Sequence, residues 1–425
     1  MDHQLSPKAT SHDAAAQGWS WSLLLAAPHR LAFFLAMVVL VESGLWWTLV
    51  QADRVVGAGL PYELSPSVVH STLMTFGFMP LFFCGFLFTA GPKWLGVAGP
   101  TTRELLPSLL LIAFGWMAWP LASHLNAIAA AAALLVAIAG LSSVTWRFWK
   151  LLRASEVPDR IHPTCIGVAM AVGCLSLAGV FVSVLADQPG LARTFVHTAL
   201  WGFIVATFVT VAHRMIPFFT SSALPMVQAW RPFWVLRALL AACAFEVACV
   251  WIELATDAAA WHGIRGAIEV TMGGVVVWLA FAWGLVQSLK VRLVAMLHLG
   301  FSWLGIGLVL SGVSQLMQAL TGEAWLPLAG LHAVTMGSLG SLTVAMVTRV
   351  TCGHGGRALV ADNIVWALYW TLQVATLLRV AAAAPTDLML RLALAAAVVW
   401  TTALGVWAVR YGRWYGLPRA DGRPG

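Results

Sequence analysis

The sequence is short of charge. Of its 425 residues only 10% are Asp, Glu, Lys or Arg, whereas 60% are hydrophobic. A water-soluble domain of ordinary composition carries roughly 25% charged residues. A water-soluble fold is therefore excluded for most of the chain, and the lipid bilayer must be its solvent.

Cysteine and tyrosine are scarce as well. The six cysteines form neither a Cys-x-x-Cys pair nor a Cys-x-x-Cys-His sequence, which excludes covalently attached haem and a cysteine-based metal or redox pair. None of the four tyrosines falls in the apolar stretch 193–218. An oxygen-reducing centre that needs a tyrosine beside its copper is therefore hard to assemble.

What the chain has instead is long apolar stretches. A helix that spans a bilayer needs roughly 20 apolar residues, and the sequence predicts an all-α polytopic membrane protein of about twelve such helices. The predicted spans are 31–51, 66–90, 104–120, 124–147, 163–185, 193–218, 232–255, 265–288, 293–320, 325–349, 360–380 and 388–410.

The basic residues between the spans predict the topology. With a cytoplasmic N-terminus, all but five of the 24 Lys and Arg residues fall in cytoplasmic segments. The five on the other side are Arg54, Arg193, Arg265, Arg379 and Arg391. This split favours an even number of spans with both termini in the cytoplasm. The net charge of +7 is thus a topology signal and not a sign of nucleic-acid binding.

The predicted organisation is a transmembrane domain between two short tails. Residues 1–30 are polar and lack a signal-peptide pattern, so we expect a cytoplasmic tail there. The membrane domain covers 31–411, and a basic cytoplasmic tail covers 412–425.

Three histidines mark an internal repeat. His70, His197 and His332 stand near the starts of the second, sixth and tenth spans, and each is followed at the fourth position by Met or Trp and soon afterwards by glycine. The pattern predicts three pseudo-symmetric units of four helices, roughly 31–150, 160–290 and 291–411. All three histidines would then lie at the same shallow depth below the outer face.

These histidines are the candidate metal ligands. Ionisable side chains are costly inside a membrane and mark cofactors or proton routes, and neutral imidazole is a common ligand of haem iron and copper. A lone membrane histidine is more often a hydrogen-bonding residue, but three at matched depth favour ligation. Two could hold a haem from facing helices, which leaves the third for a separate metal.

A second group is predicted nearer the cytoplasm. It consists of His213, His298 and His354, with Arg214, Arg349 and Arg357 as candidate partners for haem propionates. His197 and His213 are 16 residues apart on one span, or roughly 24 Å, too far for one metal centre. The second group is therefore a second haem site or a proton route. Glu246, the most deeply placed carboxylate, is the candidate catalytic proton relay, although a structural hydrogen bond would explain it equally well.

Two long stretches resemble the NnrS family of bacterial membrane proteins. HSTLMTFGFMPLFFCGFLFTAGPKWLG (70–96) is similar to the family's histidine, Phe-Gly-Phe and Gly-Phe-Leu-x-Thr-Ala-x-Pro-x-Trp signature, and LHAVTMGSLGSLTVAMVTRVTCGHGGR (331–357) carries its Arg-x-x-x-Gly-His-x-Gly-Arg motif. Ser71-Thr72-Leu73 departs from the family, where many members have a further histidine or glutamate. A second ligand on this helix is therefore not carried over.

The resemblance implies a function. Members of this family are haem- and copper-containing proteins of the bacterial inner membrane that protect against nitrosative stress. We therefore expect non-covalent haem b, with copper as a further metal, and a protein that binds and reduces nitric oxide. Electrons would come from quinol or from a separate donor protein, and the oligomeric state stays open. The architecture also resembles, more distantly, the catalytic subunit of haem-copper oxidases and nitric oxide reductases, although the histidine pairs of their binuclear centre are missing.

Two alternatives belong to other classes. Twelve spans also suit a proton-coupled secondary transporter, although a period of four helices fits its two six-helix halves poorly. A non-catalytic haem or copper protein that senses nitric oxide or delivers the metal would have the same residues as an enzyme.

Overall fold

The computed structural model describes residues 18–423, and within them every regular element is a helix. Twelve helical segments are long and apolar enough to cross a bilayer, which confirms the predicted number and makes the chain a multi-pass membrane protein. In chain order they are α2 (Pro28–Val56), α3 with α4 (Pro66–Phe76, Met79–Leu95), α5 (Thr102–Ala122), α6 (Ala127–Ala154), α7 (Ile161–Leu185), α8 with η2 and α9 (Pro189–Ala199, Leu200–Val205, Ala206–Ala223), α10 (Phe233–Ile252), α11 (Ala259–Ala282), α13 (Arg292–Thr321), α14 with η3 and α15 (Ala329–His332, Ala333–Gly340, Ser341–His354), α16 (Asn363–Ala381) and α17 with η4 (Met389–Gly412, Arg413–Gly416).

The observed helices are mostly longer than the apolar stretches that predict them. The first one starts at Pro28 and ends at Val56, beyond the predicted 31–51 on both sides. The end of the predicted tail therefore belongs to the membrane domain, and residues 1–17 lie outside the described part of the chain. The guanidinium of Arg30 donates to the carbonyls of Tyr415 and Leu417, which ties the two ends of the chain together.

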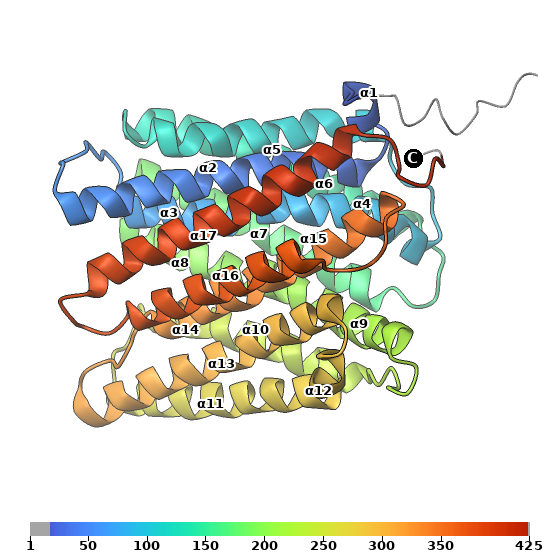
Figure 1. The fold of residues 1–425 in the computed structure, drawn as a ribbon. Helices are drawn as coiled ribbons and strands as arrows, with labels where there is room; N and C mark the ends of the chain where they lie inside the picture. The colour runs from blue at the N-terminus through green and yellow to red at the C-terminus, as the bar shows by residue number, and fades with distance from the viewer. Residues whose placement is uncertain (1–17, 424–425) are drawn as a thin grey trace, which may run out of the picture.

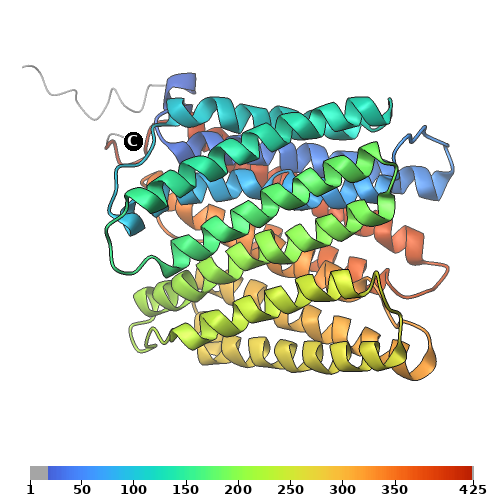
Figure 2. The ribbon, with the colours of Figure 1, turned by 180° about the vertical axis from the view of Figure 1, so that it is seen from behind.

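The helices lie side by side in a bundle whose termini share one end (Figure 1). We call this the termini end and the opposite one the distal end; the charge distribution predicts that the termini end is cytoplasmic. Figures 1 and 2 show the chain passing down one side of the bundle to α11 and returning on the other side. The last long helix, α17, packs against α2 and closes the ring.

The three histidine-bearing spans form the centre of the bundle. In the most apolar 18-residue stretch of each span, 78% of residues are buried for the span of His70 and 72% for the spans of His197 and His332. The value for α10, α11 and α16 is 33%. Each histidine-bearing span is also interrupted shortly after its histidine, by a break at Gly77 and Phe78, by the π-helix η2 and by the π-helix η3. π-helical turns are rare and are frequently found at functional sites. The division into three four-helix units stays a prediction.

The break after Phe76 has a clear sequence cause, and close packing requires a glycine within η3. Pro80 has no N–H to donate to the preceding turn, so the helix ends at Phe76 and restarts at Met79. In η3 a side chain at Gly337 would collide with the indole of Trp303, so only glycine permits this close packing. The small residues seen in the sequence after each histidine thus mark places where the helix departs from α geometry.

Two glycine pairs join α11 and α13. A Cβ atom on Gly266 would lie 2.7 Å from the carbonyl oxygen of Gly312, and one on Gly305 would lie 2.7 Å from that of Gly273. Close backbone approach at small residues is the usual way helices pack within a bilayer, where lipid removes the hydrophobic driving force. This pair carries His262, Arg265 and Glu269 on α11 and Gln315 on α13, which are considered below.

Candidate functional site

One cavity near the distal end brings together the three predicted histidines. His70 of α3, His197 of α8 and His332 of α14 all line it, and its volume is about 390 Å³. Ligand pockets in proteins measure about 300–1,000 Å³. The cavity also contacts the interrupted segments, through Leu200, Ile204 and Met336 among others. We call it the distal cavity.

His332 is held as a neutral imidazole with one free lone pair. Its Nδ1 lies 2.8 Å from the carbonyl oxygen of Leu328, which can only accept, so Nδ1 carries the proton. Nε2 is therefore an unprotonated nitrogen available as a ligand. Metal-bound histidines almost always donate their other nitrogen to such a carbonyl or carboxylate.

His70 is positioned by stacking. Its ring lies parallel to the indole of Trp47, with centroids 3.7 Å apart and an interplanar angle of 14°. Its Nδ1 is buried and has no hydrogen-bond partner among residues 18–423. A buried nitrogen of this kind costs about 1–3 kcal/mol if nothing satisfies it, which is the pattern expected of a ligand-binding residue.

His197 faces the cavity from α8 and lies near the end of α10. The indole of Trp251 donates to Thr198 Oγ1 at 3.0 Å, which fixes α10 against the helix that carries His197. Within the described residues, no three His, Cys, Asp or Glu side chains converge closely enough to hold a bare metal ion. The histidines thus surround a space larger than one ion, and their role as ligands stays a prediction.

Three arginines at the distal end of the cavity were missed as site residues. Arg54, Arg193 and Arg379 line it, and no carboxylate does. Arg54 donates to Gln51 and lies 5.2 Å from the ring of Trp47. Arg193 and Arg379 make no ion pair within residues 18–423. Three guanidinium groups beside an apolar cavity form a site for an anion or for two carboxylates.

The remaining wall of the cavity is apolar and rich in sulfur. Met74, Met79 and Met336 line it together with tryptophans of α2 and α17. Met79 Sδ accepts a hydrogen bond from Thr343 at 3.5 Å. Thioether sulfur is a soft ligand that suits copper(I), although as a wall residue methionine is also an ordinary filler.

Each histidine of the second predicted group has a different partner in the described structure. His213 Nε2 donates to the carbonyl of Pro232 at 3.1 Å, and its Nδ1 faces His162 Nε2 at 3.0 Å, so both nitrogens are engaged. His298 lies elsewhere and pairs with the hydroxyl of Thr220 at 2.8 Å. Because that hydroxyl donates to Ile216, His298 Nε2 is the donor and only its buried Nδ1 lacks a partner.

His354 forms a third pair at the termini end. Its ring lies 4.5 Å from that of His29, a residue inside the predicted tail. The C-terminal segment covers this place, because Ala420 donates to Gly355 and the carboxylate of Asp421 lies against Gly356. Hydrogen bonds from Arg419 hold the pKa of Asp421 well below its usual range, so the segment keeps its ion pair at mildly acidic pH.

Each of the three arginines predicted as propionate partners lies against a different aromatic ring. Arg214 lies 4.9 Å from the ring of Trp94, Arg349 3.9 Å from that of Phe219, and Arg357 4.0 Å from that of Trp414. Such cation–π contacts are common anchors for arginine near a membrane interface. The role of these arginines as propionate partners of a second haem stays a prediction.

Glu246 lies in an ion network on the other side of α8. Arg265 of α11 donates to Glu269 at 2.7 Å, to Glu246 at 3.3 Å and to Glu253. Glu246 thus accepts a hydrogen bond from a neighbouring helix, as the structural interpretation predicts, and its role as a proton relay stays a prediction.

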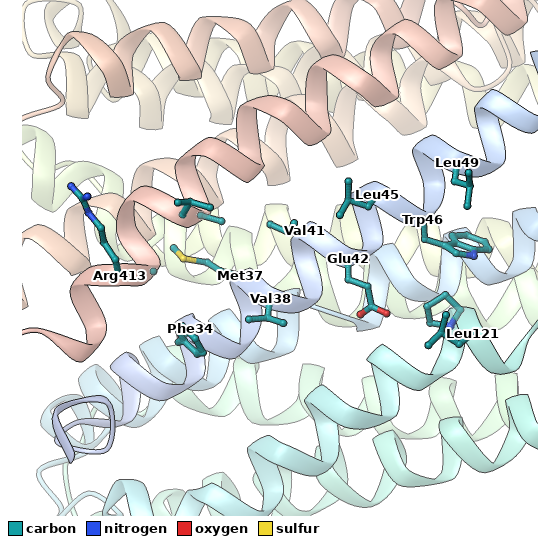
Figure 3. A pocket seen from close by; sticks show the side chains of 14 residues that line it. Phe34, Met37, Val38, Val41, Glu42, Leu45, Trp46, Leu49, Leu121 and Arg413 are labelled. Atoms are coloured by element: carbon teal, nitrogen blue, oxygen red, sulfur yellow. The ribbon is translucent and has the colours of Figure 1, made fainter. Parts of the chain in front are cut away.

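A groove on the outside of the bundle holds a carboxyl group that has no ion-pair partner in the described chain, that of Glu42. Figure 3 shows Glu42 and Trp46 projecting from α2 toward Leu121 of α5, in a groove of about 590 Å³. Its walls include strongly exposed Leu45, Leu49 and Leu121, which face the lipid. One oxygen of Glu42 is buried and has no hydrogen-bond partner in the described chain.

The comparison with protein families agrees with this architecture. A family model described as NnrS protein matches residues 23–419, nearly the whole chain. No curated protein matches the sequence.

Proposed function

The chain belongs to the NnrS family, and on that premise we propose that it binds haem in the distal cavity and there binds and reduces nitric oxide. Membership points to a membrane protein of the nitric oxide response. The observation that carries the finer proposal is the combination of a free imidazole nitrogen on His332 with three arginines and no carboxylate around one cavity.

The residues fit non-covalent haem b. His332 and His70 offer imidazoles from two of the central spans, and Arg54, Arg193 and Arg379 offer guanidinium partners for two propionates. The apolar wall between them suits the macrocycle. When bound, haem would supply an iron that binds the gas and stores electrons.

Each residue has a stated task. The Leu328 carbonyl fixes the tautomer of His332 and raises its basicity as a ligand. Trp47 holds the ring of His70. We assign copper, the second metal expected of this family, to His197 together with methionine sulfurs of the cavity wall. Nitric oxide is small, neutral and lipid-soluble, so it reaches the cavity from the bilayer.

Reduction has defined requirements. Two molecules of nitric oxide, two electrons and two protons give nitrous oxide and water. A protein that only senses the gas or delivers metal needs neither electrons nor protons at this site.

The test uses the intact protein in detergent. We expect a Soret band, haem at about one equivalent or more, and nitric oxide consumption at an electrode when an artificial electron donor is added. A Soret shift with nitric oxide but no consumption would support the sensor or delivery function. If the purified protein contains no haem and binds none when haem is added, the proposal is contradicted.

We propose that electrons come from a hydroquinone in the groove of Figure 3 rather than from a separate protein. The unpartnered oxygen of Glu42 would accept a hydrogen bond from a hydroquinone hydroxyl, and the exposed leucines would contact its apolar tail. The same helix presents Trp47, in contact with His70, to the cavity. The groove and the cavity are therefore separated by one helix.

Glu42→Gln is expected to lower hydroquinone-driven consumption of nitric oxide by about tenfold, since a hydrogen bond to a charged group contributes about 1.5–3 kcal/mol. The rate with a water-soluble reductant should not change. The conservative lipid-facing variant Leu45→Ile is the control. Equal loss with both donors, or none with either, would remove Glu42 from the electron supply.

A further inference from the structure

A continuous hydrogen-bonded chain runs from the distal surface into the buried part of α10 and α11. Asp257, whose side chain is 87% exposed, accepts from His262 Nε2 at 2.7 Å. His262 Nδ1 lies 2.6 Å from Gln315 Oε1, and Gln315 Nε2 donates to Glu253 at 3.4 Å. Arg265 then connects Glu253 with two deeper carboxyl groups.

The partners of His262 fix its charge. Gln315 donates its amide nitrogen to Glu253, so its oxygen faces His262. Both ring nitrogens of His262 therefore lie against oxygens that only accept. Two donors are needed, and only the imidazolium form has two. The hydrogen-bonded chain thus contains a histidine that is charged in this geometry. His262 can release a proton from Nε2 toward Asp257 or from Nδ1 toward Gln315.

The inner end of the chain is a pair of carboxyl groups. Glu246 is 1% exposed and Glu269 is fully buried. One oxygen of each, Glu246 Oε1 and Glu269 Oε2, has no hydrogen-bond partner within residues 18–423. The other titratable groups that face the pair are Arg265, Glu253, Cys243 and Cys249. A single guanidinium cannot neutralise three carboxylates, and an uncompensated buried charge costs several kcal/mol. A proton bound to Glu246 or Glu269 neutralises the uncompensated negative charge and so removes the cost of burying it.

The chain also reaches the neighbourhood of the distal cavity. Glu253 follows Trp251, which is bonded to Thr198 beside His197 and meets Phe195 edge-on at 5.2 Å. The charged groups that act on His197 are Glu253, Arg265 and Arg193. The contact between Trp251 and Thr198 therefore places Glu253, at the end of α10, near the helix that carries His197.

We propose that the titratable groups Asp257, His262 and Glu253 form a proton uptake path from the distal face to the cavity, with Glu246 and Glu269 as its buried proton reservoir. Gln315 and Arg265 only position these groups, since neither an amide nor a guanidinium releases its proton, and water would carry the proton past them. The path rests on the proposed function for the reaction that consumes its protons. A purely structural network that ties α10, α11 and α13 together would need neither the charged histidine nor two unpartnered buried oxygens.

The first test needs neither haem nor nitric oxide. Infrared spectra of the purified protein are expected to contain the carbonyl band of a protonated carboxyl group, which disappears in Glu246→Gln or Glu269→Gln. On transfer to deuterated water this band should shift rapidly in the wild type. His262→Gln, which can keep hydrogen bonds but cannot relay protons, should slow the shift by about 10²-fold, the usual contribution of a positioned proton-transfer group.

Controls separate relay from folding. Glu323→Gln removes an exposed acid at the same end outside the chain and should exchange like the wild type. Thermal unfolding of His262→Gln should stay near that of the wild type, and His262→Phe should reproduce the slow exchange. Absence of the protonated carboxyl band, or unchanged exchange in both His262 variants, would overturn the proposal.

The second test addresses the link to the reaction. In proteoliposomes, His262→Gln should lower nitric oxide consumption by about 10²-fold while haem content and the Soret shift with nitric oxide stay unchanged. If the wild type itself consumes no nitric oxide, the proposed function fails while the infrared result still decides whether the path exists. Full activity of His262→Gln alongside slow exchange would show that the path does not serve the cavity.

Discussion

Purified His332→Ala protein is expected to lose its Soret band, with haem content at least about tenfold below that of the wild type, because outer partners alone change metal affinity 10–100-fold and this variant removes the ligand itself. His332 is the one cavity histidine whose tautomer the described structure fixes with a ligand nitrogen free. The measurement is the ratio of Soret to protein absorbance, with haem quantified after extraction.

Two comparisons make this result specific to ligation. His298→Ala removes a fully buried histidine outside the cavity and is expected to keep its haem. His332→Gly leaves space for free imidazole, and millimolar imidazole should restore the Soret band if the ring is an iron ligand. A His332 variant with full haem content, or one that loses haem together with its fold, would contradict the assignment.

Much of the fold could be predicted because one dominant variable, hydropathy, decides it. A bilayer requires each crossing to be apolar over a fixed length and to satisfy its own backbone groups, so spans such as α7 are visible directly from the sequence. Helix ends were predicted less well. At α2 the helix continues through Arg54 to Val56, because polar residues can extend a helix into the interface without interrupting it.

The inner histidines show what hydropathy leaves undetermined. Hydropathy predicts how deep a residue lies along the membrane normal, and the second predicted group, His213, His298 and His354, does lie nearer the termini end. Their positions around the bundle depend on which helices become neighbours. The partners His29 and His162 were overlooked because one lay in the predicted tail and the other just before a predicted span. Depth alone therefore could not predict these partners, and a shared role for the three histidines stays a prediction.

The missed site residues did leave a signal in the sequence. Five arginines depart from the predicted charge asymmetry because they lie outside the cytoplasmic segments. The positive-inside interpretation treats them only as exceptions. Arg54, Arg193 and Arg379 line the distal cavity, and Arg265 holds the acidic network. A charge that persists where the topology rule disfavours it needs another reason to be there. Exceptions to the rule were better guides to the site than the basic residues that obeyed it.

Arg265 is expected to be the most sensitive position for stability. Replacing it with methionine keeps much of the side-chain volume but leaves Glu246 and Glu269 buried without a cation. Breaking a buried ion pair by removing one partner costs about 3–5 kcal/mol, so Arg265→Met should unfold at a much lower temperature in detergent. Arg391→Met, an exposed arginine at the same end, is the control and should behave like the wild type.

The carboxyl groups, and not the lost packing, should be the cause of this instability. Adding Glu246→Gln and Glu269→Gln to Arg265→Met removes the two uncompensated acids and should recover a large part of the lost stability. Residues in one ion network are expected to be non-additive in this way, by about 0.5–3 kcal/mol. If the triple variant is no more stable than Arg265→Met, the loss comes from packing between α10 and α11. Because a guanidinium favours the ionised form of a nearby carboxyl group, the reservoir should keep its proton in Arg265→Met, which its infrared band can show independently of stability.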